Sequence, residues 1–303
     1  MSGELPEGGD PFRSGYVGLA GRPNVGKSTL VNALCGSHVA IVSDKPQTTR
    51  RRQLGVVHAP GAQLVLVDLP GFQRPLDRLT ERMQRSVDDS LADVDIVCLV
   101  LDASARVGGG DRMVAERAFA SGRPVVIALN KVDLLTPVRI AAAIEVAASL
   151  GPFEALHPVS AKTSDGVSAL RTDLIGLLAA GPAYFGDDVD SDLSLELRIG
   201  ELVREQALRL TREEVPHAIA VAIEELTPPR RGRMGRVTAS LVVETDSQRR
   251  IMIGSGGSMV RAIGEGARRG IEPLLGGRVF LELTVRVRRN WRRDDAQLDR
   301  FGL

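Results

Sequence analysis

The chain has 303 residues, of which 43% are hydrophobic and 25% are charged, a composition typical of a globular protein long enough for two domains. No apolar run approaches the roughly 18 residues that a membrane-spanning helix needs, which argues against an integral membrane protein. The net charge is only +1, but residues from Glu196 onward hold 20 arginines against 15 acidic residues, whereas the first 195 residues hold 19 basic and 23 acidic residues. We therefore expect the second part of the chain to attract anions.

Residues 1–12 are rich in glycine, proline and acidic residues and lack an apolar core, so we expect a disordered segment and not a signal peptide. Cys35 and Cys98 fall in apolar segments, as expected for reduced core residues of a cytoplasmic protein. Only four of the 39 basic residues are lysines, so each lysine is a candidate for a specific role. The four are Lys27, Lys45, Lys131 and Lys162.

Residues 13–180 alternate short apolar runs with longer helical stretches. This alternation predicts an α/β domain with a mostly parallel, doubly wound sheet. Ligands of such sheets bind at the carboxyl ends of the strands, and every motif described below lies there. The strands expected are residues 15–20, 63–68, 95–102, 123–130 and 154–159.

The segment GRPNVGKS, Gly21–Ser28, follows the first predicted strand and opens a helix. It has the G-x-x-x-x-G-K-S pattern of a phosphate-binding loop (P-loop), in which backbone N–H groups surround the phosphates. We expect Lys27 to neutralise the β- and γ-phosphate oxygens and the Ser28 hydroxyl to bind Mg²⁺. A bare strand-to-helix turn would not need this lysine and serine in addition.

The segment DLPG, Asp68–Gly71, ends the next long strand about 40 residues after the phosphate loop. We expect Asp68 to hold Mg²⁺ through water and the Gly71 N–H to sense the γ-phosphate. Many GTPases place a water-orienting glutamine directly after this glycine, but here the position is Phe72, with Gln73 one residue further on. Since Phe72 can neither orient nor deprotonate water, we predict slow intrinsic hydrolysis.

The polar loop after the phosphate-loop helix contains QTTR, Gln47–Arg50. One of its threonines is expected to bind Mg²⁺ while the γ-phosphate is present and to release it on hydrolysis. Thr49 is favoured over Thr48 for this role.

Two further strand ends predict a guanine pocket. In NKVD, Asn130–Asp133, the Asp133 carboxylate can accept hydrogen bonds from N1–H and the exocyclic amine of guanine, a donor pair that adenine lacks. The Lys131 stem can lie over the base. In VSAK, Val159–Lys162, the Ala161 amide is expected near guanine O6.

Together these motifs predict a GTP-binding switch that carries Mg²⁺. The nucleotide-site residues are Gly21, Arg22, Pro23, Asn24, Val25, Gly26, Lys27, Ser28, Thr29, Asp68, Leu69, Pro70, Gly71, Phe72, Asn130, Lys131, Val132, Asp133, Ser160, Ala161 and Lys162. The Mg²⁺ ligands expected are Ser28, Thr49 and Asp68.

A linker is expected at residues 181–193, where glycine, proline and aspartate accumulate. Residues 194–303 then read as helix, strand, strand, helix, helix, strand, the order of an α+β KH domain of type II. The elements expected are helix 194–212, strands 218–225 and 237–245, helices 247–253 and 259–275, and strand 279–286. The loop TPPRRGRMGR, residues 227–236, is a basic hairpin connection.

The segment IMIGSGG contains the G-x-x-G that in a KH domain clamps the backbone of four single-stranded nucleotides. Ser255 and Gly256, at its centre, carry no charge. We expect Ile251 and Ile253 to pack beneath the loop and the single tryptophan, Trp291, to cap the core. The RNA-binding residues expected are Arg249, Arg250, Ile253, Gly254, Ser255, Gly256, Gly257 and Arg261.

The union of GRPNVGKST, QTTRRR, DLPG, NKVD and SAK with IMIGSGG and VRVRRNWRRDD resembles the bacterial Era GTPases, from about Gly15 to Leu303. The resemblance implies a monomeric, GTP-controlled RNA chaperone that binds GTP and GDP and the 3′ end of 16S ribosomal RNA during processing and 30S subunit assembly. It also implies a cytoplasmic protein with peripheral membrane association. By the same resemblance, Asn24 helps to bind a K⁺ that replaces an arginine finger. The catalytic residues it implies are Asn24, Lys27, Thr49 and Gly71.

Two other functions remain open at this point. A membrane-associated or cell-cycle signalling GTPase would use the second domain to bind protein or lipid. An RNA-modification GTPase would need a further catalytic cluster of cysteine and histidine, which the sequence does not offer.

Overall fold

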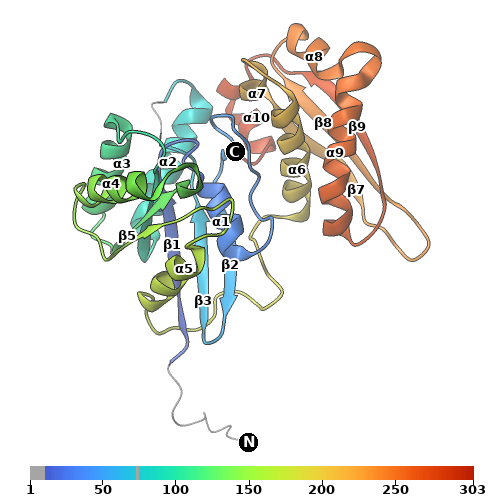
Figure 1. Cartoon of the computed structure of the whole chain (residues 1–303). Helices are drawn as coiled ribbons and strands as arrows, with labels where there is room; N and C mark the ends of the chain where they lie inside the picture. Colours follow the sequence, from blue (N-terminus) through green and yellow to red (C-terminus); the bar gives the residue numbers. More distant parts are fainter. Residues whose placement is uncertain (1–10, 73–74) are drawn as a thin grey trace, which may run out of the picture. The chain divides into compact units, whose positions relative to one another are not determined.

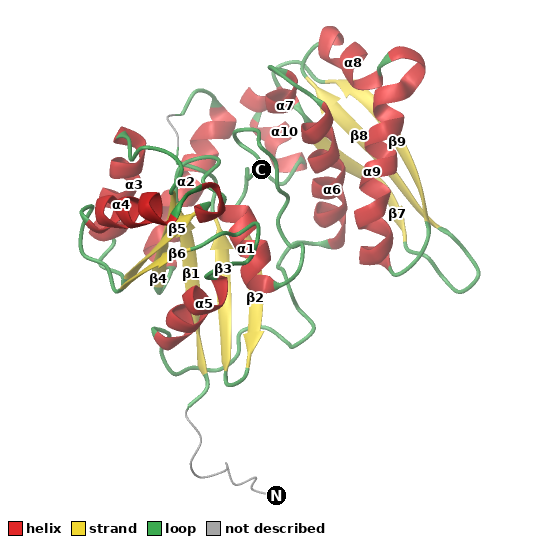
Figure 2. Ribbon diagram, in the orientation of Figure 1, coloured by secondary structure: helices red, strands yellow, loops and turns green. Residues whose placement is uncertain are grey.

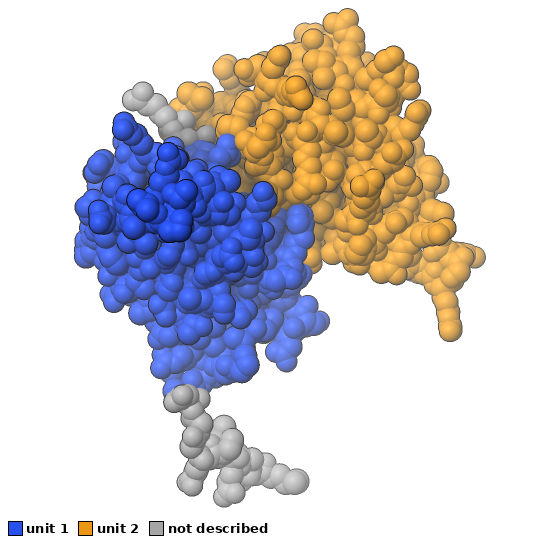
Figure 3. Space-filling model, viewed as in Figure 1, with its two compact units in different colours: residues 1–40, 52–72, 87–192 blue, residues 41–51, 73–86, 193–303 orange. Residues whose placement is uncertain are grey.

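The structure is a computed structural model that describes residues 11–72 and 75–303. Most of the segment expected to be disordered, residues 1–12, therefore lies outside the described residues. The chain divides into two compact units, coloured separately in Figure 3. The first comprises residues 1–40, 52–72 and 87–192, and the second residues 41–51, 73–86 and 193–303.

The first unit contains a six-stranded sheet in the order β2-β3-β1-β4-β5-β6. All neighbouring pairs are parallel except β2 and β3, so the predicted α/β fold with a mostly parallel sheet is confirmed. Each predicted strand is present, with ends within two residues of the expected ones, but β2 was not predicted. The strands are β1 Arg13–Ala20, β2 Gln53–Ala59, β3 Ala62–Asp68, β4 Ile96–Asp102, β5 Val125–Asn130 and β6 Ala155–Pro158.

Helices cover both faces of this sheet, as Figure 2 shows. Side chains of α1 and α5 form one hydrophobic core with the sheet, and those of α3, α4 and the end of α2 form a second core on the other face. Because both faces are covered, the central strands are almost continuously apolar, as in IVCLVL of β4. The helices are α1 Lys27–Cys35, α2 Arg78–Asp93, α3 Gly109–Ala120, α4 Pro137–Ala148 and α5 Val167–Gly176.

The second unit contains a three-stranded sheet in the order β7-β8-β9, in which β7 and β8 are antiparallel and β8 and β9 parallel. Helices α6 and α9 pack on one face of this sheet. The predicted order of helices and strands is confirmed, with two unpredicted short helices, α7 and α10, in addition. The elements are α6 Leu195–Leu210, α7 Val215–Ala218, β7 Ala220–Thr227, β8 Gly235–Val243, α8 Asp246–Ile253, α9 Ser258–Leu275, β9 Val279–Val287 and α10 Asp295–Arg300.

A smaller core on the other face of this sheet surrounds Trp291, which is fully buried. Val242 of β8 points into this core and its neighbours Leu241 and Val243 into the other, as the alternation along a strand requires. The indole N–H of Trp291 donates to the carbonyl oxygen of Ala218 at 2.9 Å. The prediction that Trp291 is a core residue is confirmed.

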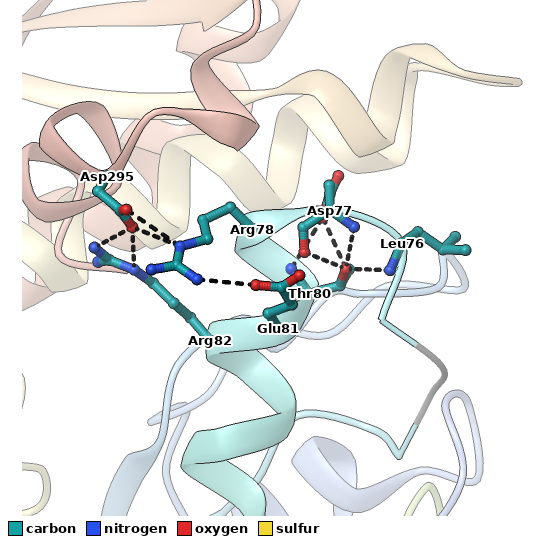
Figure 4. A network of polar contacts seen from close by, with 7 residues as sticks. All are labelled: Leu76, Asp77, Arg78, Thr80, Glu81, Arg82 and Asp295. Carbon is teal, nitrogen blue, oxygen red and sulfur yellow. Dashed lines mark hydrogen bonds and ion pairs between the residues drawn. The ribbon is translucent and has the colours of Figure 1, made fainter.

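The start of α2 belongs to the second unit and is tied to α10 by a polar network (Figure 4). Asp295 accepts from the Nη2 of Arg82 at 2.6 Å and from the Nε of Arg78 at 3.1 Å. Hydrogen bonds from Arg82 and Arg78 lower the pKa of Asp295. At the start of the helix the Thr80 N–H donates to Asp77 Oδ1 at 3.0 Å, which satisfies one of the first-turn N–H groups.

Candidate functional site

The phosphate loop connects β1 to α1 and holds a buried lysine at its centre. The Nζ of Lys27 donates to the carbonyl oxygens of Gly21 and Arg22 at 3.0 and 3.1 Å, and the residue is only 6% exposed. Burial lowers the pKa of Lys27 to about 8, although the carboxylate of Asp68 opposes this shift. An ammonium held in this way inside a loop is suited to neutralise nucleotide phosphates.

A hydroxyl and a carboxylate meet beside this lysine. The Ser28 Oγ donates to Asp68 Oδ2 at 2.7 Å, and Asp68, at the end of β3, is almost fully buried. Such oxygen ligands suit Mg²⁺, which takes few protein ligands and completes its coordination with phosphate oxygens and water. The described residues contain no group of three or more His, Cys, Asp or Glu side chains that could hold a metal by themselves. The pair therefore fits a metal that binds together with the nucleotide.

The DLPG segment lies directly against the phosphate loop. A Cβ on Gly71 would lie 2.7 Å from the backbone nitrogen of Pro23, so only glycine fits at this position. The next residue, Phe72, is 3% exposed and packs in the core, with the guanidinium of Arg117 5.3 Å from its ring centroid. A side chain buried in the core contributes nothing to the activation of water. Gln73 lies outside the described residues.

Asn130 joins three of the predicted motifs. It is 2% exposed; its Nδ2 donates to the carbonyl oxygen of Val25, and its Oδ1 accepts from the Ala161 N–H, both at 2.9 Å. The amide expected near guanine O6 is thus bonded to Asn130 in this structure. A base could receive that N–H only by sharing or replacing this bond.

Lys131 and Asp133 carry the polar groups of the predicted base pocket. The Nζ of Lys131 donates to the carbonyl oxygen of Asn24 at 2.7 Å and forms an ion pair with Asp102 at 2.6 Å. Asp133 is exposed, and the buried Ser160 orients its carboxylate through a 2.7 Å hydrogen bond. Sequence reasoning missed Asp102, although it ends β4 at the same edge as the other motifs.

The other predicted nucleotide-site residues lie in the same four segments, which are the phosphate loop, DLPG, NKVD and VSAK. Arg22 is fixed by an ion pair with the buried Asp111 at 2.6 Å, another residue that the motifs do not contain. Lys162 is exposed. Pro23, Asn24, Val25 and Gly26 precede α1, Thr29 lies in its first turn, Leu69 and Pro70 follow β3, and Val132 follows β5.

Thr48 and Thr49 lie in the segment before β2 that belongs to the second unit. Arg204 of α6 donates to the Thr48 carbonyl oxygen. The guanidinium of Arg50 is buried and donates to the carbonyl oxygen of Ile219 at 2.6 Å. Residues of the second unit therefore hold this segment, and the role of Thr49 as a Mg²⁺ ligand stays a prediction.

The GSGG loop separates α8 from α9. Gly254, Gly256 and Gly257 have φ angles of 71°, 55° and 79°, in the left-handed region that glycine adopts most readily. This backbone leaves Ser255 and Gly256 exposed. Three arginines nearby are also exposed, and none forms an ion pair with an acidic residue of the described chain. They are Arg249 and Arg250 on α8 and Arg261 near the start of α9.

The expected packing beneath the loop is wrong in one position. Ile251 is 46% exposed, and Met252 is the residue of this turn that is fully buried. Ile253 is half-buried. The apolar run IMI cannot show by itself which residue faces the sheet, because all three residues are equally apolar; the helical phase of α8 decides.

Comparison with known families agrees with both units. A family model described as a 50S ribosome-binding GTPase matches residues 16–131, and one described as a KH domain matches residues 214–292. GTPase Era of Geotalea uraniireducens strain Rf4 is 40% identical over 291 residues, covering 96% of this chain and 98% of the relative. GTPase Era of Mycobacterium sp. strain JLS is 43% identical over 295 residues, covering 96% and 99%.

Two solved structures are similar over nearly the whole chain. One is Era in complex with MgGDPNP and nucleotides 1506–1542 of 16S ribosomal RNA, and the other is a variant of Aquifex aeolicus Era bound to GDP.AlF4⁻. Each has a TM-score of 0.92 at 35% identity and covers 96% of this chain and 99% of its own. This chain is therefore a member of the Era family of GTPases.

Proposed function

We propose that the chain binds GTP with Mg²⁺ in the first unit, binds the 3′ end of 16S ribosomal RNA with the second, and serves 16S processing and assembly of the 30S subunit. One observation carries the proposal: two kinds of site occur in one chain. In the first unit Asn130 joins the P-loop, the NKVD segment and the SAK segment, and in the second unit a GSGG loop lies between two helices. The related Era structure that holds both MgGDPNP and a 16S fragment supports this combination.

In the nucleotide site, Lys27 neutralises the phosphates, and Ser28, Asp68 and Thr49 hold Mg²⁺, which stabilises charge on the transferred phosphoryl group. Asp133 reads the guanine edge. With Phe72 in the core, hydrolysis relies on positioning and charge neutralisation. Asn24 supports a K⁺ that adds the charge of an arginine finger; single-turnover hydrolysis should then be faster in K⁺ than in Na⁺, and equal rates would refute the K⁺ site.

In the second unit, the GSGG loop approaches the phosphodiester chain through its exposed residues Ser255 and Gly256, and Arg249, Arg250 and Arg261 neutralise the phosphates. A Cβ on Gly256 would meet no atom within 4 Å, so the loop has room for contact with a ligand.

RNA binding by the full chain tests the proposal. The double variant Ser255→Asp with Gly256→Asp places two negative charges on the clamp. The matched control is Ser255→Asn with Gly256→Asn, which imposes the same shape and the same backbone strain without charge. We expect the Asp pair to lose binding to nucleotides 1506–1542 of 16S ribosomal RNA, and the Asn pair to retain more of it. Equal binding by wild type and the Asp pair would refute the clamp.

No helix in the described part of the chain is long and apolar enough to cross a membrane. Cytoplasmic location, a monomeric state and a peripheral membrane contact remain predictions, and no surface of the described residues specifically favours the last.

A further inference from the structure

The loop between β7 and β8 and the turn between α9 and β9 form one basic surface at one end of the second unit's sheet. Its charged members, here called the hairpin arginines, are Arg230, Arg231, Arg233 and Arg278, all exposed. They line an open hollow of about 480 Å³, shared with Pro229, Gly232, Met234, Gly276 and Gly277. Nothing in the nucleotide site or the GSGG clamp uses these residues.

Like charges face each other at the tip of the hairpin. Arg230 and Arg233 are paired directly across it, through N–H···O bonds of 3.1 and 2.8 Å, with Arg231 and Gly232 as the turn. Directly opposed like charges destabilise a strand pair. None of the hairpin arginines forms an ion pair with an acidic side chain of the described chain, whereas their neighbour Arg236 pairs with Glu282 at 3.3 Å. The cost of this arrangement falls when an anion lies between the guanidinium groups.

The base of the hairpin is firmly packed. A Cβ on Gly235 would lie 2.9 Å from the ring of Pro229, and one on Gly277 would lie 3.0 Å from the same ring. The Gly235 N–H also donates to the Arg278 carbonyl oxygen at 2.9 Å. Pro229 therefore fastens the hairpin to the α9–β9 turn, so that the arginines of both loops project from one fixed base. Such preorganisation lowers the entropic cost of binding.

The hairpin arginines lie far from the GSGG clamp. The clamp precedes the first residue of α9, and Gly276 follows its last, so the 18 residues of α9 separate the two sites. At 1.5 Å per residue this is about 27 Å, and Figure 1 shows α8 and the β7–β8 loop at opposite ends of the sheet. A clamp that holds four nucleotides does not cover this distance.

We infer that the hairpin arginines bind the sugar-phosphate backbone of RNA that flanks the four clamped nucleotides. This inference rests on the proposed function, because it assumes that the clamp holds RNA. Four guanidinium groups around an open hollow match phosphate geometry, since a guanidinium can donate two parallel hydrogen bonds to one phosphate. An anionic lipid surface would need apolar side chains beside the charges, and Met234, 60% exposed, is the one large apolar residue lining the hollow.

The test compares two RNAs on the full chain loaded with MgGDPNP. One is a single strand of about six nucleotides, enough for the clamp; the other is 16S nucleotides 1506–1542. The variant replaces Arg230, Arg231 and Arg233 by alanine, and a second variant replaces them by lysine. The control, of equal charge change, replaces three exposed arginines of the first unit, Arg112, Arg139 and Arg171, by alanine.

We expect the alanine variant to bind the short strand as tightly as wild type does, and to bind the long RNA roughly tenfold or more weakly. The slope of log affinity against log salt concentration should fall by about 2, because each lost phosphate contact removes about 0.7. The lysine variant should recover most of the affinity and the control should lose little. If the alanine variant bound the long RNA as tightly as wild type does, this inference would be overturned while the proposed function would stand. If the alanine substitutions weakened binding to phosphatidylserine vesicles but not to the long RNA, the inference would be overturned in favour of a membrane contact. Failure of wild type to bind either RNA would instead refute the proposed function.

Discussion

The side-chain amide of Asn130 donates to the carbonyl oxygen of Val25 over 2.9 Å, which ties the end of β5 to the phosphate loop. The other end of the same amide accepts from Ala161. One buried side chain thus fixes the spacing between the segment predicted to bind the phosphates and the segments predicted to bind the base.

Asn130→Ala should therefore weaken nucleotide binding, because it releases the phosphate loop and the Ala161 segment from each other. It leaves the buried Val25 carbonyl and the Ala161 N–H without their partner, at about 1–3 kcal/mol each if water does not replace it. We expect GDP affinity, measured by calorimetry, to fall by at least tenfold. Asn130→Asp keeps an acceptor for Ala161 but turns a buried carboxylate oxygen toward the Val25 carbonyl oxygen, so it should weaken GDP binding at least as much as Asn130→Ala. Unchanged affinity in Asn130→Ala would show that the tie is dispensable.

The buried Lys27 should make the stability of the nucleotide-free protein depend on pH. Its pKa is lowered from 10.5 to about 8 by burial, so the unfolded state binds more protons between these values and stability rises with pH across this window. Lys27→Met removes the buried ammonium. Below pH 8 the variant should be more stable than wild type, by on the order of 3 kcal/mol at most, and this advantage should shrink above pH 8.

Thermal unfolding followed by circular dichroism between pH 7 and 9.5 measures both proteins. The same variant should lose GDP binding, because the phosphates lose their cation. A stability difference that does not change with pH would contradict the assignment of a buried, charged Lys27.

Asp133 is predicted to read the exocyclic amine of guanine. Inosine diphosphate lacks this amine, so wild type should bind GDP about 10- to 100-fold more tightly than inosine diphosphate, as expected for one hydrogen bond to a charged group. Asp133→Ala should bind both ligands weakly and nearly equally. If the variant kept the wild-type preference, another group would be reading the amine.

Arg50 is predicted to stabilise the second unit. Its guanidinium donates to the carbonyl oxygens of Ile219 and His217 at 2.6 and 2.9 Å and lies 5.7 Å from the centroid of the Trp291 ring. Burial lowers its pKa. Arg50→Ala leaves the carbonyls at the end of α7 without this donor and should cost roughly 2 kcal/mol or more.

Trp291 is the only tryptophan and lies in the second unit, so its fluorescence during urea unfolding reports on that unit. The urea transition of Arg50→Lys should lie between those of wild type and Arg50→Ala, because one ammonium cannot reach the same acceptors. The exposed Arg112→Ala serves as control and should leave the transition in place. A transition for Arg50→Ala that coincides with wild type would contradict the prediction.

The sequence was sufficient for the central strands of the first unit, because a parallel sheet buries them on both faces and leaves an unbroken apolar run, as in residues 96–101. It was insufficient for β2, whose residues QLGVVHA follow a polar loop and include a glycine and a histidine. Pairing with β3, a contact formed only in the tertiary structure, makes this segment a strand.

The candidate site was predictable where chemistry demands a residue type at a fixed spacing, as for Lys27 and Asp68. The acidic partners of Lys131 and Arg22 were not predicted, because Asp102 and Asp111 reach them from other elements. The assignment of Arg50 to the second unit was also unpredictable, since its partners follow more than 160 residues later.

The central claim, that GTP controls RNA binding, is tested most directly by measuring the affinity of the full chain for nucleotides 1506–1542 of 16S ribosomal RNA in the MgGDPNP and MgGDP forms. We predict that the GDPNP form binds more tightly by a factor between about 5 and 150, the usual range of coupling between two sites. Thr49→Ala, which removes the predicted γ-phosphate-dependent ligand, should abolish this difference while leaving GDP binding intact. Equal affinity of the two wild-type forms would contradict a nucleotide-controlled switch.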